Sequence, residues 1–357
     1  MKILVGMSGG VDSSCTAMLL KEQGHEVMGA TMAIWGERGI KQHYEQQSQR
    51  THGACFGPDE KEDIEAARAI CKQINIPFYV FDCASQYDKI VLDNFKKEYL
   101  SGNTPNPCIW CNSLIKFGVL PEMARQSGIN FDKFATGHYA RNVFENGKYV
   151  LKRGLDEKKD QSYFLYRLSQ NQLENILLPL GEYTKEEIRK IALKHGLKSA
   201  EKPDSQDFYA GDYNDLLEIE EKTGNIVDTN GKILGAHKGF WNYTIGQRRG
   251  LKVSADEPLY VIELRKDTNE VVVGKKDKTM NNTLIACNIK LNTNLLPARC
   301  KAKIRSNQIP TPVSAEVKND ELIVKFDDMQ KSIAKGQSVV LYDNDTVLGG
   351  GIIKEVM

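Results

Sequence analysis

A glycine-rich loop near the start of the chain has the composition of a phosphate-binding site. The loop reads SGGVDSS over residues 8–14, between an apolar run at 3–5 and a helical pattern that carries Met18, Leu19 and Leu20. Glycines let backbone N–H groups approach a phosphate, and the N-terminus of a helix adds a favourable dipole. The loop lacks the lysine of GxxxxGK[ST], so it is not a Walker loop.

The pattern SGGxDS is typical of enzymes that split ATP between its α and β phosphates and release pyrophosphate. In such a loop Asp12 would position Mg²⁺ or the leaving group, and Ser8 and Ser13 would donate hydrogen bonds to phosphate. The alternative is a glycine-rich turn with a polar helix cap. The position of the loop between a strand and a helix favours the phosphate site.

Cysteines form the second group of residues with chemical potential. Cys108 and Cys111 have CxxC spacing in TPNPCIWCNSLIKFG, residues 104–118. Close thiols can exchange sulfur, or they can bind a metal ion or a cluster, and a lone CxxC leaves these roles open. Cys55, in the loop after the second predicted strand, is a candidate third ligand, with an ordinary loop cysteine as the alternative. Cys15 and Cys71 lie on apolar helix faces and are predicted to be core residues.

The elements that must position these residues alternate between strand and helix. Apolar runs at 3–5, 26–34 and 78–81, and one that ends at 134–135, are separated by helical patterns. This order predicts a doubly wound parallel sheet of the α/β class, whose ligands bind beyond the carboxyl ends of the strands. The pattern TKEE at 184–187 predicts a capping box that opens a helix ending near Gly196.

The second half of the chain has the pattern of β-hairpins. Turn sequences at 228–231 and 266–269 separate short alternating runs, and further short strands follow from about 284. We therefore predict a catalytic α/β domain at 1–203, a small central α+β domain at 204–283 and a β-barrel at 284–357.

Four cations alternate along one predicted strand of the barrel. Side chains alternate between the two faces of a strand, so these four cations would lie on one face and could bind a phosphate backbone. We call them the basic stripe: Arg299, Lys301, Lys303 and Arg305. A solvated strand face is the alternative.

The composition and net charge argue against a globally basic, a membrane-spanning or a secreted protein. The 357 residues carry a net charge of +1, so nucleic-acid binding requires a local basic patch. No apolar run approaches the roughly 18 residues of a membrane span. The start of the chain has no apolar region that would predict a signal peptide. A chain with eight cysteines that lacks both a signal peptide and a membrane span is typical of a reduced cytoplasmic protein.

Six motifs in order give the chain a family resemblance. They are SGGVDSS, TPNPxxxCN followed by IKF, ATGHYA at 135–140, KKDQSYFL at 158–165, LPLGEYTKEE at 178–187 and YTIGQRRGL at 243–251. Together they resemble the tRNA-specific 2-thiouridylase family over nearly the whole length. The resemblance implies ATP-dependent adenylation of O2 of the wobble uridine, after which sulfur displaces AMP to give 2-thiouridine. It also implies that the protein binds tRNA, ATP and Mg²⁺, and that it receives sulfur from a persulfide carrier protein or from inorganic sulfide.

The resemblance also implies roles for individual residues. Cys111 matches the reactive cysteine, and the catalytic set is Cys111, Cys108 and Asp12. The ATP-binding set is Gly6, Met7, Ser8, Gly9, Gly10, Val11, Asp12, Ser13, Met32 and Gly137. The tRNA-binding set is Asn106, Pro107, Cys108, His138, Lys159, Asp160, Gln161, Arg305, Ser306 and Gln308.

The chain departs from the family pattern at two positions. Cys108 stands where well-known members carry Asp, and Tyr209 stands where they carry a second catalytic cysteine. Either Cys108 and Cys111 relay sulfur locally, or they bind a [4Fe–4S] cluster together with Cys55. Two other functions remain as alternatives: a synthetase of the same loop type acting on a small molecule, and a non-catalytic sulfur carrier or iron–sulfur scaffold.

Overall fold

The computed structural model describes residues 1–36, 54–197, 199–200, 208–209, 211 and 213–357. The long loop expected after the second strand and the boundary predicted at 203 lie outside these residues. The chain divides into two compact units. The first comprises Met1–Val91, Pro107–Gly211 and Asp345–Val347, and the second comprises Leu92–Asn106, Asp212–Asn344 and Leu348–Met357.

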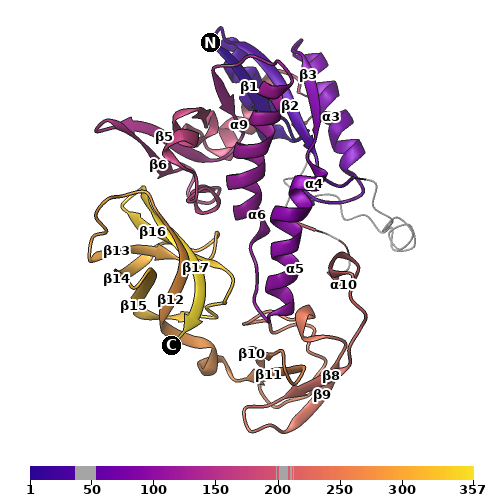
Figure 1. The fold of residues 1–357 in the computed structure, drawn as a ribbon, viewed down its shortest axis with the longest axis vertical. Helices are drawn as coiled ribbons and strands as arrows, with labels where there is room; N and C mark the ends of the chain where they lie inside the picture. The colour runs from indigo at the N-terminus through magenta and orange to yellow at the C-terminus, as the bar shows by residue number, and fades with distance from the viewer. Residues whose placement is uncertain (37–53, 198, 201–207, 210, 212) are drawn as a thin grey trace. The chain divides into compact units, whose positions relative to one another are not determined.

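The first unit is built on a parallel sheet in the order β3-β2-β1-β4-β7 (Figure 1). Its strands are β1 (Lys2–Gly6), β2 (Glu26–Ala33), β3 (Phe78–Asp82), β4 (Lys133–Ala135) and β7 (Ile176–Leu177). The predicted parallel strands are confirmed. Since the chain order reverses between β1 and β4, the carboxyl ends of these two strands mark the edge where ligands of such sheets bind.

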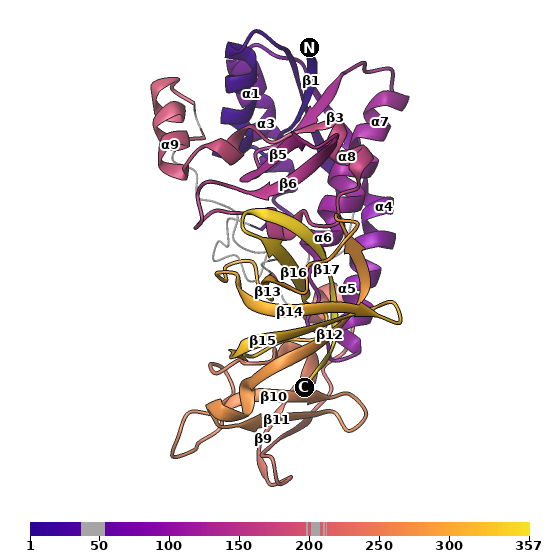
Figure 2. The same cartoon turned by 90° about the vertical axis from the view of Figure 1, so that its left-hand side faces the viewer.

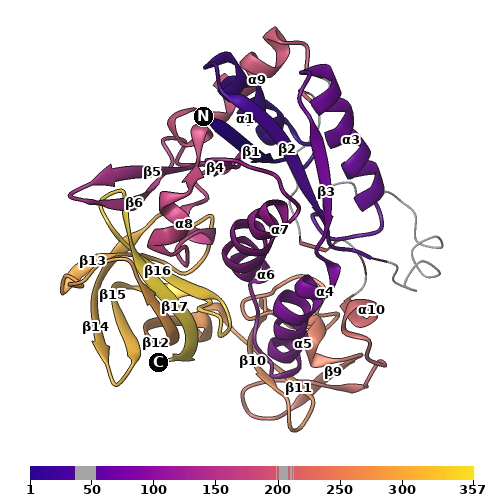
Figure 3. The same ribbon diagram turned by 45° about the horizontal axis from the view of Figure 1, so that its top comes forward.

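Helices cover this sheet, and α3 runs beside β3 (Figure 3). The helices are α1 (Val11–Glu22), α3 (Glu60–Gln73), α4 (Ala84–Tyr87), α6 (Pro107–Trp110), α7 (Leu120–Gln126), α8 (Gln170–Glu174) and α9 (Lys185–Lys194). Shorter turns are η1 (Asp88–Leu92), η3 (Ser162–Phe164) and η4 (Pro179–Glu182), and a π-helical segment, η2 (Cys111–Val119), joins α6 to α7. A hairpin of β5 (Ala140–Glu145) and β6 (Lys148–Arg153) completes the unit.

The core of the first unit lies between the sheet and its helices. Ile3 and Val5 of β1 pack with Cys15 of α1 and Cys71 of α3, all of them buried. The two cysteines are therefore core residues, as predicted. The capping box at α9 is also confirmed, because the Thr184 hydroxyl accepts from the Glu187 N–H while the Glu187 carboxylate accepts from the Thr184 N–H.

The second unit contains a small mixed sheet in the order β10-β11-β8-β9. Its elements are β8 (Gly224–Val227), β9 (Ile233–His237), β10 (Tyr260–Arg265) and β11 (Glu270–Gly274), with α5 (Asp93–Leu100), α10 (Tyr213–Leu217), η5 (Phe240–Asn242) and η6 (Lys276–Thr279). Both predicted hairpins form, and β11 pairs with β8 in parallel.

Six strands close into a barrel in the order β12-β15-β14-β13-β16-β17, with β17 pairing back to β12 (Figure 2). They are β12 (Met280–Leu291), β13 (Arg299–Lys303), β14 (Thr311–Lys318), β15 (Glu321–Lys331), β16 (Ser338–Asp343) and β17 (Thr346–Val356). The predicted fold class, a doubly wound sheet followed by a small mixed part and a β-barrel, is thus confirmed. Closure leaves no unpaired strand edge within the barrel.

Candidate active site

The glycine-rich loop connects β1 to α1 at the carboxyl edge of the parallel sheet. Gly10 is the N-cap of α1, and no side chain caps the helix there. The hydroxyls of Ser13 and Ser14 instead donate to the Gly10 carbonyl, at 3.2 and 2.7 Å. The Ser8 and Ser13 hydroxyls lie 3.2 Å apart. The loop therefore gathers two hydroxyls at a helix N-terminus, an arrangement suited to a phosphate.

Two glycines allow neighbouring segments to pack closely on this loop. Gly9 has φ +73°, and a Cβ there would lie 2.8 Å from the Asp63 carbonyl oxygen of α3. A Cβ on Gly137 would lie 2.7 Å from the carbonyl carbon of Asp12. Gly137 is therefore placed against the loop, after β4. Met32, another residue of the predicted ATP-binding set, lies near the carboxyl end of β2.

Asp12 is held by two side chains from distant parts of the chain. The Tyr139 hydroxyl donates to its Oδ1 at 2.8 Å, and Lys185 Nζ lies 2.7 and 2.8 Å from its two carboxylate oxygens. Lys185 is only 6 % exposed, although it is the first residue of α9. Sequence reasoning missed Lys185, because a lysine that follows an N-cap is normally exposed to solvent.

The cysteines form a second group in the same unit. Cys108 lies in α6, and Cys111 is the first residue of the π-helical segment. A hydrogen bond between the thiols of Cys55 and Cys108 lowers the pKa of Cys55 to about 7 and raises the pKa of Cys108 well above its usual range. Burial raises the pKa of the Cys111 thiol to about 12. The structure thus brings Cys55 to the CxxC pair, and all eight cysteines are free thiols.

A site for a single metal ion would require three donors around one point. Among the residues that the structure describes, no group of three or more His, Cys, Asp or Glu side chains could hold a metal ion. The thiols of Cys55, Cys108 and Cys111 influence one another electrostatically. They are therefore neighbours, but they are not arranged around a single ion.

The π-helical segment is stabilised from outside. The wide i→i+5 turn is rare and occurs often at functional sites. The Gln172 side chain donates to the carbonyls of Ser113 and Phe117 at 2.7 and 3.1 Å. Asn112, which follows Cys111, is 5 % exposed, and its Oδ1 has no hydrogen-bond partner among the described residues.

Tyr209 is an aromatic packing residue. Its ring stacks on Trp35 with centroids 6.4 Å apart and lies 6.2 Å from the ring of Phe56. The Phe56 N–H donates to the Phe208 carbonyl at 3.1 Å, and the Cys55 thiol lies 3.8 Å from the same oxygen. The segment that carries Tyr209 therefore lies directly beside Cys55.

Two residues of the predicted tRNA-binding motif at 159–161 have internal partners. Asp160 is 6 % exposed, and its carboxylate accepts from the N–H groups of Gly154 and Ser162 and pairs with Arg153. Gln161 accepts from the Tyr139 N–H at 2.9 Å. The Asp160 side chain is therefore buried and anchors this loop, and a contact of the motif at 159–161 with tRNA stays a prediction.

Of the remaining predicted residues of the first unit, two are partly accessible and one is buried. His138 is half-buried, its Nδ1 lies 2.8 Å from the Thr136 hydroxyl, and burial holds the pKa of its ring well below the usual range. At neutral pH the ring is therefore neutral. Pro107 is the buried first residue of α6, and Lys159 is half-buried.

The basic stripe is only partly exposed, which corrects the prediction of four aligned cations. Lys303 is 2 % exposed and lies over the Tyr342 ring at 6.0 Å. Arg299 forms two hydrogen bonds to the carboxylate of Asp327. Lys301 and Arg305 are exposed. Gln308 is turned inward, donating to Gln330 and accepting from the Ile304 N–H, and Ser306 and Asn106 are half-buried.

We expect the two lysines of this strand to behave differently on substitution. Lys301→Ala should weaken tRNA binding and reduce the slope of log affinity against log salt by about one unit per lost phosphate contact. Lys303→Ala should instead lower the melting temperature, because it opens a cavity beside Tyr342. Binding titrations over a salt series, with thermal melts, test both. An unchanged slope in Lys301→Ala would make this lysine an ordinary solvated residue.

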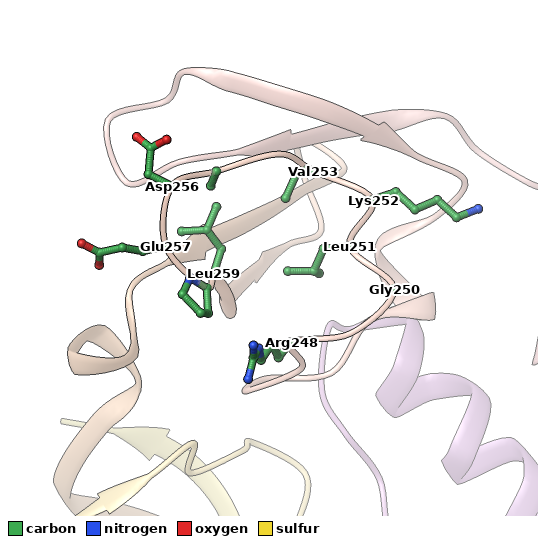
Figure 4. A pocket seen from close by; sticks show the side chains of 10 residues that line it. Arg248, Gly250, Leu251, Lys252, Val253, Asp256, Glu257 and Leu259 are labelled. Atoms are coloured by element: carbon green, nitrogen blue, oxygen red, sulfur yellow. The ribbon is translucent and has the colours of Figure 1, made fainter.

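A pocket in the second unit is formed without the phosphate loop and the cysteines. It is lined by one loop, Arg248 with residues 250–253 and 255–259 (Figure 4). Arg248 lies at its edge (Figure 4). The pocket is lined by neither the phosphate loop nor a cysteine, so it does not compete with the site of the first unit.

Comparisons with known proteins agree with the sequence resemblance. Three family models match consecutive parts of the chain: a tRNA methyl transferase HUP domain at 1–209, a tRNA methyl transferase PRC-barrel domain at 216–275 and an aminomethyltransferase beta-barrel domain at 281–353. A tRNA-specific 2-thiouridylase MnmA from Endomicrobium trichonymphae is 48 % identical over 99 % of both chains. The chain belongs to this family. Relatives of the same name from Carboxydothermus hydrogenoformans and Lachnoclostridium phytofermentans share 44 % and 43 % identity over at least 98 % of each chain.

Family membership applies to both units, because the three matches run from the parallel sheet through the mixed sheet to the barrel. The described residues include no helix that is long and apolar enough to cross a membrane.

Proposed function

We infer that the chain is a tRNA sulfurtransferase that converts a tRNA uridine to 2-thiouridine at the expense of ATP. The observation that carries this inference is the pairing of an uncapped pyrophosphatase-type loop with a cluster of three thiols in one unit. The relatives named 2-thiouridylase match over essentially the whole chain. The family models are described as methyl transferases, but an ATP loop and a thiol cluster are the groups that activation and sulfur transfer require.

The activation step uses the residues around α1. The loop N–H groups and the hydroxyls of Ser8 and Ser13 bind phosphate, while Asp12 would hold the Mg²⁺ that neutralises the leaving pyrophosphate. Uridine O2 attacks the α phosphorus, the bond to the β-phosphate oxygen breaks, and an adenylated uridine forms. Adenylation allows this oxygen to leave C2 as part of AMP, whereas the unmodified O2 is a poor leaving group.

The sulfur step uses the cysteines. In its persulfide form, the terminal sulfur on Cys111 attacks C2 of the adenylated uridine and AMP leaves. The Cys108 thiol then attacks the Cys111 sulfur, which releases 2-thiouridine and leaves a Cys108–Cys111 disulfide. A thiol reductant then restores the two thiols, and a persulfide carrier protein transfers its terminal sulfur to Cys111. Inorganic sulfide can instead attack the Cys111 sulfur of the disulfide, which forms the Cys111 persulfide and releases the Cys108 thiolate. Tyr209 has no thiol and stacks on Trp35, so Tyr209→Phe should retain most of its activity.

A [4Fe–4S] cluster is the other form of the sulfur site. The thiolates of such a cluster bind different irons, so they lie farther apart than the ligands of a single ion. The three thiols are neighbours that do not surround one point, and this arrangement is compatible with a cluster. In that case Cys55, Cys108 and Cys111 would hold the cluster, leaving one iron for sulfide.

We expect Cys55→Ser to distinguish the two forms. A cluster held by three thiolates would lose its iron and its activity in this variant, because a hydroxyl is a poor ligand for iron. A local persulfide pair would keep most of its activity. Iron content and absorbance after anaerobic purification, measured beside the thiolation rate, give the answer. Iron-free wild-type protein that thiolates tRNA at full rate would exclude the cluster.

The overall function is tested by incubating the protein with tRNA, ATP, Mg²⁺ and sulfide, and by measuring AMP, pyrophosphate and 2-thiouridine. All three products should appear in equal amounts. AMP formation with a small amide-forming substrate in place of tRNA would support the synthetase alternative. Absence of AMP would support a non-catalytic sulfur carrier.

Three further expectations belong to this proposal. The chain has domains at 1–203, 204–283 and 284–357, it acts in the reducing cytoplasm, and it recognises tRNA partly through Lys301 and Arg305 of the barrel. The free state of all eight cysteines supports the second of these.

A further inference from the structure

We propose that Lys185 is the phosphate-binding cation of the nucleotide site, and that its pairing with Asp12 is the state of the site without nucleotide. This inference rests on the proposed use of ATP, and it assigns to the phosphate loop the positive side chain that SGGVDSS itself lacks. A Walker loop carries such a lysine within its own sequence. Here the lysine comes from α9, 173 residues further along the chain.

The burial of Lys185 requires an explanation. Its side chain is 8 % exposed, whereas the Asp12 side chain is 30 % exposed and so faces solvent at the loop. A buried ion pair gains little net stability, because removing both charges from water costs about as much as their attraction returns. An apolar pair would stabilise the fold as well. The pair is therefore better explained by a role that needs both charges beside the phosphate loop.

The position of Lys185 is set independently of Asp12. Thr184 caps the helix through a complete capping box, and the Lys185 N–H donates to Asp156 at 3.0 Å. Lys185 Nζ also lies 5.7 Å from the centre of the Tyr139 ring. These contacts hold the ammonium group at the start of α1, where the Ser13 hydroxyl and the helix N-terminus already favour an anion.

The chemistry of the site indicates an exchange of partners. Without Mg²⁺, the Asp12 carboxylate repels phosphate and holds Lys185. With Mg²⁺ and nucleotide bound, Asp12 would hold the metal ion and Lys185 would be available to the phosphates. Since Asp12 and Lys185 then act on phosphate in opposite directions in the absence of Mg²⁺, their separate contributions can be measured by nucleotide binding alone, without turnover.

The test measures ATP and adenosine binding in EDTA for wild type, Asp12→Asn, Lys185→Met and the double variant. We expect Asp12→Asn to bind ATP more tightly than wild type, because it removes the repulsion and releases Lys185. Adding Lys185→Met to Asp12→Asn should then weaken ATP binding about tenfold or more, while adenosine binding stays unchanged. Lys190→Met, on the exposed face of the same helix, is the matched control and should bind ATP as wild type does.

The double variant decides between the proposal and a purely structural pair. If Lys185 only neutralises Asp12, adding Lys185→Met to Asp12→Asn leaves ATP affinity unchanged, and the proposal is overturned. Lys185→Arg, which keeps the charge, should recover part of the ATP affinity in the same background, and melting curves confirm that each variant is folded. Wild-type protein that binds ATP but does not thiolate tRNA would refute the proposed function and leave this inference standing.

Discussion

Cys111→Ser should abolish 2-thiouridine formation while leaving ATP affinity and tRNA affinity at wild-type levels. Serine cannot carry a persulfide sulfur, and it is a poor ligand for iron, so the loss follows from either form of the sulfur site. Nucleoside analysis of the digested tRNA by mass spectrometry measures the product directly. Cys108→Ser should give the same result, because this thiol either resolves the persulfide or binds the cluster.

The matched control for these variants is Cys300→Ser. Cys300 is a half-buried thiol in β13 of the barrel, and the proposed chemistry does not use it. Its substitution should change thiolation by less than about twofold, since substitutions away from special features are usually mild. Full activity of Cys108→Ser would refute both the persulfide pair and the three-thiolate cluster at once.

Asp12→Ala should reduce AMP formation on cognate tRNA by roughly 10²–10³-fold, the loss typical of removing one group that stabilises the charge of a transition state. Thiolation should fall in parallel, because the uridine is no longer activated. Asp12→Asn should give the same loss with Mg²⁺ present, since a neutral amide is a weaker ligand for this ion.

Structural damage must be separated from this catalytic loss. Asp12→Ala removes a carboxylate that pairs with the buried Lys185 ammonium, so a lower melting temperature is expected. Asp12→Asn fills the same space and keeps an oxygen near Tyr139, so it should melt closer to wild type. AMP release near the wild-type rate in folded Asp12→Asn would mean that this loop does not activate the uridine.

Local signals in the sequence predicted the fold well. The capping box at Thr184 and Glu187 formed as expected, because both of its hydrogen bonds connect residues three apart. The turn at 228–231 joined β8 to β9 for the same reason, since turn residues set the hairpin geometry locally. The order of strands and helices was enough to predict the parallel sheet.

What the sequence could not show depends on distant contacts. Lys303 shares the alternation of Lys301 and is still part of β13, yet it is buried beside the Tyr342 ring of β16, a contact that the pattern of one strand does not show. The π-helical segment after Cys111 has the composition of an ordinary helix, and its wide turns depend on Gln172, some 55 residues away from Phe117. Lys185 and Asp12 meet only through the fold.

The second unit includes Leu92–Asn106, the stretch that leads directly into the cysteine pair. The Thr104 N–H donates to the Lys335 carbonyl, and the Gln337 side chain donates to the carbonyls of Thr104 and Pro105. Gln337 follows Thr104 by 233 positions. On a ribosome that adds about 5–20 residues per second, its partner therefore emerges roughly 10–50 s later.

A nascent chain consequently displays Cys108 and Cys111 long before the stretch beside them is fastened. A truncation before Lys335 would leave Thr104 and Pro105 without these hydrogen bonds, even though every cysteine of the site is still present.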